Sequence, residues 1–254
     1  MTHIRHIKQV AATGLAWLLL TAASTPASTA SQIADLLDAD KPIEAFALAQ
    51  EKAGEGDPEA QFALGWFYDS GRHITADKAK AAAQYRKCAD KGLSQCQWRL
   101  GVMYDIGEGV ATDPATAFAW ISKAAAQKNP GALSSLAVMY ATGHGTPIDY
   151  AKAMEAYKAA ADGGEAAGFY GVGILYLEGQ GVPENGEEAA AWFSVGAAVG
   201  DEQAKTASDL LLKDQATEVL DRVASRATAI YSEYVAPVQP LPARPTPEEA
   251  RKAP

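Results

Sequence analysis

The sequence predicts an all-α protein, an α-solenoid of antiparallel helix pairs. Three observations predict it. The chain repeats itself every 36 residues, each repeat carries apolar residues at helical spacing, and a glycine-containing turn separates the two helical halves of a repeat. A repeat of this length that encodes two helices cannot bury its apolar face alone, so neighbouring repeats stack into a continuous core.

The period is visible in columns that stay in register along the chain. Five segments align when they begin at Ala45, Ala81, Ala117, Ala153 and Ala189. Within them an aliphatic residue, a tyrosine and a glycine recur at fixed offsets. The columns are Leu64, Leu100, Leu136 and Val172; Tyr68, Tyr104, Tyr140 and Tyr176; Gly71, Gly107, Gly143 and Gly179.

Each repeat encodes two helices and the turn between them. The first helix places a small residue, an aliphatic residue and a tyrosine at spacings of four, as in "CQWRLGVMY", which puts all three on one stripe. The second helix carries large aromatics, as in "AFAWISKAAA". In the turn, glycine adopts the left-handed conformation at little cost, and Asp or Asn is expected to cap the second helix.

The segment "YATGHGTPIDYAK" contains one such turn, with His144 between two glycines. His144 occupies the column that holds Glu108 and Gln180 in the neighbouring repeats. A column that accepts Glu, His and Gln is typical of a solvent-facing turn. We therefore expect His144 to be neither catalytic nor a metal ligand.

The two ends of the chain differ from the repeats. Residues 1–30 read as a signal peptide, because Arg5 and Lys8 precede an apolar run and small residues follow. Cleavage is expected after Ala30, or alternatively after Ala27. The apolar run is too short to span a bilayer, so no stable membrane insertion is expected after cleavage. A leading partial repeat is expected over 31–56, the repeat solenoid over 57–213, a capping helix over 214–234 and a disordered Pro-rich tail over 235–254.

Charge and cysteine content narrow the setting of the protein. The chain has 22 basic and 31 acidic residues, a net charge of -9, which argues against nucleic acid as a partner. The only two cysteines, Cys88 and Cys96, suggest a disulfide in an exported chain. Their spacing suits a staple between two adjacent antiparallel helices. Together with the signal peptide, this predicts a periplasmic or secreted protein.

The repeated columns resemble the Sel1-like repeat family, relatives of the tetratricopeptide repeat. The motif A-x-x-x-L-G-x-x-Y-x-x-G-x-G-V is nearly complete in residues 96–113, and the resemblance extends over about 45–213. The resemblance implies two antiparallel helices per repeat, and Cys88 and Cys96 match the spacing of cysteine-rich bacterial members. The first full repeat departs from the pattern, with His73 where the second glycine belongs.

Signatures of catalysis and of metal or cofactor binding were not found in the sequence. It lacks Ser-x-x-Lys, G-x-S-x-G, H-E-x-x-H and a phosphate-binding loop. His73 and His144 fall on turns in different repeats, which makes a shared metal site improbable. No catalytic residue, metal or cofactor is therefore predicted, and the chain is not expected to be an enzyme.

The remaining candidate is a surface. By analogy with tetratricopeptide packing, the first helix of each repeat lines a concave groove at positions two before, two after and five after the aliphatic column. Large aromatics beside acids suit a peptide-binding groove, although the same aromatics could instead pack between helices as core. The predicted groove residues are Phe62, Trp66, Asp69, Trp98, Asp105, Tyr170 and Ile174, with Val102, Ser134, Val138 and Leu177 at equivalent positions.

The leading hypothesis is an exported, non-enzymatic adaptor or scaffold that binds a protein or peptide in this groove. A second is a protein that binds or hydrolyses cell-wall peptides or β-lactams, an activity described for some relatives. A third is a periplasmic regulator of a membrane sensor. The sequence does not identify the partner.

Overall fold

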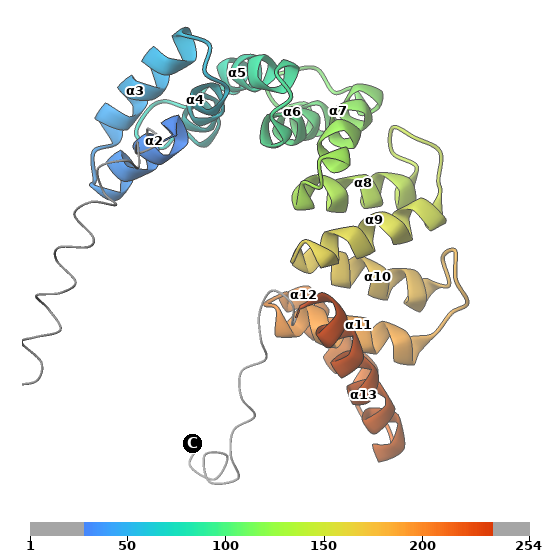
Figure 1. Cartoon of the computed structure of the whole chain (residues 1–254). Coiled ribbons are helices and arrows are strands. Elements are labelled where there is room, and N and C mark those ends of the chain that lie inside the picture. The colour runs from blue at the N-terminus through green and yellow to red at the C-terminus, as the bar shows by residue number, and fades with distance from the viewer. Residues whose placement is uncertain (1–27, 236–254) are drawn as a thin grey trace, which may run out of the picture. The chain divides into compact units, whose positions relative to one another are not determined.

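The structure is a computed structural model that describes residues 28–235. Over this range it contains 12 helices and no strand, which confirms the all-α prediction (Figure 1). The chain forms two compact units, here called the N-terminal unit (residues 28–64) and the main unit (residues 65–235). Most of the predicted signal peptide and nearly all of the predicted tail lie outside the described residues.

The N-terminal unit contains α2 (Thr29–Asp38), α3 (Pro42–Gly54) and the first half of α4 (Pro58–Ser70). α2 packs on α3, whose buried face is a row of alanines. The side chain of Ser28 caps α2 by accepting a hydrogen bond from the backbone N–H of Ser31. α2 therefore begins two residues inside the segment predicted as the signal peptide.

The main unit is a stack of helix pairs. It completes α4 and continues with α5 (Lys78–Asp90), α6 (Ser94–Ile106), α7 (Pro114–Ala126), α8 (Pro130–Thr142), α9 (Tyr150–Asp162), α10 (Ala166–Glu178), α11 (Gly186–Ala198), α12 (Glu202–Leu212) and α13 (Thr217–Tyr234). From α6 to α12, each helix packs on the one before it, and α13 packs on α11. The starts of α6, α8, α10 and α12 are spaced by the predicted 36 residues, so the solenoid prediction is confirmed.

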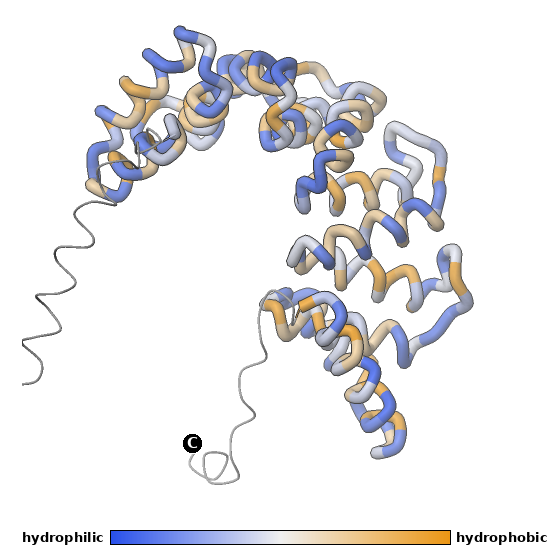
Figure 2. Tube along the Cα trace, viewed as in Figure 1, coloured by the Kyte–Doolittle hydropathy of each residue, from blue (hydrophilic) through white to orange (hydrophobic). Residues whose placement is uncertain are grey.

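Small and large side chains alternate through the core of the main unit. The large aromatics of the second helices are buried: Trp120, Tyr157, Trp192 and Phe193. Alanine and glycine columns face them and allow close approach of the helices. In Figure 2 hydrophobic positions are spread along the helices of the main unit, and on α13 they alternate with hydrophilic ones.

The turns follow the predicted chemistry. Gly107 and Gly143 end α6 and α8 in the left-handed conformation, and Asp113 and Asp149 cap the helices that follow. The second glycine of the turn after α8, Gly145, has φ of +71°, and a Cβ there would lie 2.2 Å from the carbonyl oxygen of Pro114. Glycine is required at this position both by its backbone conformation and by the close approach of the preceding repeat.

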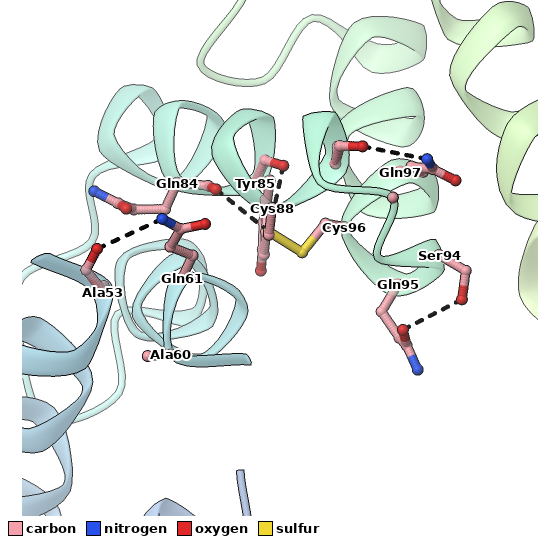
Figure 3. Close-up of a disulfide and its surroundings, with 12 residues drawn as sticks. Ala53, Ala60, Gln61, Gln84, Tyr85, Cys88, Ser94, Gln95, Cys96 and Gln97 are labelled. Atoms are coloured by element: carbon pink, nitrogen blue, oxygen red, sulfur yellow. Dashed lines mark hydrogen bonds between the residues drawn. A yellow bond between two sulfur atoms is a disulfide. The ribbon is translucent and has the colours of Figure 1, made fainter. Parts of the chain in front are cut away.

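The predicted disulfide is present. Cys88 near the end of α5 is bonded to Cys96 at the start of α6, with their Cα atoms 5.8 Å apart (Figure 3). Both side chains are fully buried. On the chain-entropy model, closing so short a loop stabilises the fold by about 2–3 kcal/mol.

The helix at the C-terminal end, α13, packs on α11 through Val223 and Ile230. Its arginines also bond to the start of α11. Arg226 pairs with Glu188 at 2.8 Å and Arg222 pairs with Glu187 at 2.6 Å. Within residues 28–235 no helix is long and apolar enough to cross a membrane.

Candidate functional site

A pocket of about 460 Å³ opens between α6 and α8. Its size is within the range of clefts that hold small ligands or side chains of a partner. Three of its residues (Val102, Asp105 and Val138) occupy predicted groove positions. The pocket is lined by Val102, Asp105, Ile121, Ser135, Val138, Met139, Thr142, Gly143 and His144.

The helical spacing of α6 and α8 explains why these side chains converge. Val102 and Asp105 are three residues apart on α6, and Ser135, Val138, Met139 and Thr142 follow each other at spacings of one, three or four along α8. Residues three or four apart share a helix face. The buried side chains of Ile121 and Met139 form apolar walls, while Val138 is 47% exposed. The pocket is therefore mostly apolar and has a polar rim.

The polar rim is a carboxylate beside an imidazole. Nε2 of His144 lies 2.8 Å from Oδ1 of Asp105, a separation that forms an ion pair when the imidazole is protonated. Oδ1 is itself buried and accepts no hydrogen bond within the described part of the chain. The imidazole supplies this carboxylate with an opposite charge only in its protonated form.

In the preceding repeat, the carboxylate at the equivalent position has a different partner. Asp69, one period before Asp105, bonds to Nζ of Lys78 at 2.6 Å, and the same ammonium lies 2.8 Å from Glu108. The hydrogen bonds to Asp69 and then to Glu108 raise the pKa of Lys78 above its ordinary value of 10.5. Asp69 thus has a cation from its own chain.

The predicted groove residues do not all line this pocket, and the tryptophans among them make packing contacts. Trp98 packs between repeats: its Nε1 donates to Oγ of Ser135 on α8 at 3.1 Å, and a Cβ on Gly131 would meet its ring at 2.7 Å. Trp66 is half-buried, with its ring edge against Phe67 and the guanidinium of Arg72 5.9 Å from its centroid.

The other predicted positions lie further along the chain or in the other unit. Tyr170 and Ile174 are half-buried and pack against an apolar cluster with Phe193 and Ala204. Phe62 is half-buried in the N-terminal unit. The structure therefore groups Val102, Asp105 and Val138 around one pocket and places the aromatics in or beside packing contacts.

The position of His144 opposite Asp105 was not predicted. His144 is exposed in a turn, as expected, but the turn lies over the end of the preceding first helix. The signal in the sequence is a separation of 39 residues, one period plus three. Asp69 and Glu108 have the same separation and share Lys78.

Two hydroxyl groups line this pocket beside Asp105 and His144. Oγ of Ser135 donates to the carbonyl oxygen of Gly131 at 2.8 Å and accepts from Trp98, and Oγ1 of Thr142 donates to the carbonyl oxygen of Val138 at 2.8 Å. No hydrogen bond from Ser135 to His144 occurs among the described residues. Within residues 28–235 no group of three or more His, Cys, Asp or Glu side chains is arranged to hold a metal ion.

A second cavity, of about 430 Å³, lies where α12 and α13 meet the start of α11. Its acid Glu187 is already paired with Arg222, and burial of its Leu211 and Val223 belongs to the packing of the C-terminal end. The pocket between α6 and α8 is the better candidate, because its carboxylate has no permanent cation.

Comparison with known proteins gives the family. The Sel1 repeat matches four consecutive segments, residues 58–93, 94–129, 130–165 and 166–201. The chain belongs to the Sel1 repeat family. Each matched segment begins at or next to the start of a first helix, α4, α6, α8 or α10.

Solved structures agree with this assignment. A Sel1 repeat protein from Oxalobacter formigenes is 28% identical with a TM-score of 0.69, and the alignment covers 83% of this chain and 85% of that one. A protective antigen of uropathogenic Escherichia coli with the same repeat fold is 23% identical with a TM-score of 0.52. That alignment covers 80% of this chain but spans only 52% of the antigen. No curated protein sequence matches this chain.

Proposed function

We propose that this Sel1 repeat protein is an exported, non-enzymatic adaptor that binds a protein or peptide segment on its first-helix face. This face is the surface of α6, α8 and α10 in the main unit. Sel1 repeat solenoids are commonly scaffolds for protein interactions. The observation that carries the proposal is the pocket between α6 and α8, which is lined both by an exposed valine, Val138, and by the carboxylate of Asp105.

A substitution at Val138 tests this function. Val138→Glu places a charge at the mouth of the pocket, and Leu220→Glu on α13 is the matched control, because Leu220 is also exposed but does not line the pocket. Each protein is immobilised and incubated with an envelope extract of the bacterium that produces it. A partner is a protein retained by the wild type and by Leu220→Glu but lost from Val138→Glu.

The affinity of that partner then gives the size of the effect. Truncating or charging a central interface residue commonly costs at least about tenfold in Kd. Binding is measured with the purified partner. If Val138→Glu retained every protein that the wild type retains, the first-helix face between α6 and α8 would not be the binding surface.

Export is the second part of the proposal. It is supported by the charged and apolar N-terminal segment and by the disulfide, since disulfides persist mainly in oxidising compartments. Of the two cleavage sites, the contacts of α2 favour the one after Ala27. Ser28 then remains as the helix cap, and Thr29 keeps its hydrogen bond to Asp57 at 2.7 Å.

The mass of the protein from the envelope fraction tests export and the site of cleavage separately. We expect a chain that begins at Ser28. A chain that begins at Ser31 would show export with the other cleavage site, at the loss of a cap worth about 1 kcal/mol. A chain that retains residues 1–20 would contradict export.

A further inference from the structure

We propose that the pocket between α6 and α8 binds a cationic side chain of the partner, an arginine, with its guanidinium against Asp105. This inference rests on the proposed function and specifies the chemistry of the partner. It is carried by the comparison of two successive repeats in which the same carboxylate column has different partners.

In the first of these repeats the cation comes from the chain itself. Lys78 is the first residue of α5, and its ammonium bridges Asp69 and Glu108. One period later, Asp105 stands in place of Asp69 and His144 in place of Glu108, but Pro114 stands in place of Lys78. Proline supplies no cation, so the second repeat has the carboxylate without the lysine.

His144 does not replace that lysine. An imidazole carries a charge only when it is protonated, whereas a lysine is permanently charged at neutral pH. Nε2 of His144 lies 2.8 Å from Oδ1 of Asp105, and this oxygen is buried. The Asp105 side chain is 33% exposed, against 20% for Asp69. Oδ1 is buried, so the exposed part of Asp105 is the rest of its side chain, which lines the pocket and has no lysine beside it.

The shape of the pocket fits the rest of an arginine side chain. The stem of arginine is apolar and its head donates five hydrogen bonds in a fixed plane, a geometry that suits a carboxylate. Val102, Val138 and Met139 offer apolar surface to the stem, and Asp105 accepts from the head. The net charge of -9 also favours a basic partner segment.

The probe is N-acetyl-arginine amide, titrated into the chain with methyl-labelled valines and followed by NMR. We expect saturable shifts of the Val102 and Val138 methyl groups with a Kd of about 1 mM, the affinity ordinary for a fragment of this size. N-acetyl-citrulline amide has nearly the same shape without the charge and is expected to cause no saturable shift.

Three variants locate the binding site of the probe. Asp105→Asn keeps the shape of the side chain and is expected to weaken binding by about tenfold or more, as for loss of a charge-assisted hydrogen bond. Asp69→Asn is the matched control in the same column and is expected to leave the Kd unchanged, because Asp69 is already paired with Lys78. Pro114→Lys restores the missing lysine and is expected to compete with the probe, again by about tenfold or more, without altering Asp105.

The outcomes separate this proposal from the proposed function. Equal shifts with the arginine and citrulline probes, or full binding by both Asp105→Asn and Pro114→Lys, would overturn the arginine assignment. Shifts that follow the protein concentration rather than the probe would assign the pocket to a second copy of the chain, which also overturns it. If Val138→Glu still lost the partner protein, the proposed function would survive either result.

Discussion

The junction between α6 and α8 and the junction between α10 and α12 are built from the same columns but differ in character. The first is an open pocket with a polar rim. The second is an apolar cluster around Phe193 and Ala204. Two periods separate the matching residues: Val102 and Ile174, Asp105 and Leu177, Ile121 and Phe193, Ser135 and Ala207, Met139 and Leu211.

The difference shows how one repeat pattern can build both an open and a closed junction between helices. The columns that hold the helices together vary little, because a change in size there disturbs the packing of both neighbours. The columns on the first-helix face vary freely. Where they are apolar, as at Leu177, the junction closes and adds to stability. Where they are polar, as at Asp105, the junction stays open as a pocket.

The largest effect is expected from breaking the closed junction. Phe193 is fully buried, and its ring centroid lies 5.4 Å from that of Tyr170, with the two ring planes tilted by 40°. Phe193→Ala removes that burial and leaves a cavity, at a cost of roughly 3–5 kcal/mol in the free energy of unfolding. Urea unfolding followed by circular dichroism measures the loss. A loss below about 1 kcal/mol would mean that this cluster does not stabilise the C-terminal end.

Exchanging the residues of the two junctions tests the comparison directly. Leu177→Asp puts a carboxylate against an apolar cluster and is expected to cost about 2 kcal/mol or more, because the buried side chains of that cluster offer it no hydrogen-bond donor in place of water. The reciprocal Asp105→Leu removes a carboxylate with a buried oxygen together with its half-exposed contact to His144, and is expected to leave stability unchanged or to raise it by up to about 1 kcal/mol. Thermal unfolding of both variants gives the result. Similar losses from both would show that the two junctions do not differ as described.

A smaller effect is expected at the tryptophan that bridges the open junction. Trp98→Phe keeps most of the ring but removes the hydrogen bond from Nε1 to Ser135, a loss of about 1 kcal/mol in stability. Tyr170→Phe is the matched change two periods later and removes a hydroxyl for which no hydrogen bond is found within residues 28–235. Chemical unfolding of the two variants should therefore differ. If Trp98→Phe were neutral and reduced binding to the partner instead, Trp98 would act as a groove residue.

The fold of the main unit follows from the sequence because the signals that encode it are local and repeated. Gly107 and Asp113 mark the end of one helix and the start of the next, and the columns at Leu100 and Tyr104 give the buried stripe. The disulfide follows for the same reason, since Cys88 and Cys96 flank one short turn. The same signals recur in four repeats, so one exception does not change the predicted fold. His73, for example, adopts φ of +65° at a position where glycine is expected.

The candidate site was predicted only in part, because it depends on contacts between repeats. The helical register places Asp105 and Val138 on the first-helix face. The register does not predict that the turn of the next repeat places His144 beside Asp105. It also does not predict the hydrogen bond from Trp98 to Ser135. These contacts depend on how far each turn reaches over its neighbour, which no single repeat encodes.

The smallest effect concerns α13, which covers the far side of α11 at the closed junction. Burial raises the pKa of Glu188, but hydrogen bonds from Arg226 and Trp192 outweigh it and hold this pKa below its ordinary value of 4.5. A carboxyl with a lowered pKa in the fold stabilises it fully above the ordinary value and loses that contribution as the pH falls through the lowered one. The contact of α13 should therefore be constant from pH 7 to about pH 5 and weaken below about pH 4.5.

The stability difference between the wild type and Glu188→Gln, measured by urea unfolding across this pH range, reports that contribution. It should not exceed about 1 kcal/mol at pH 7, because the Arg226 side chain is 45% exposed and its charge is screened by water. Arg226→Ala is the control: in its background, the part of the difference due to the ion pair should disappear. A difference that stays constant down to pH 3, or that is unchanged by Arg226→Ala, would show that Glu188 is held by packing rather than by its charge.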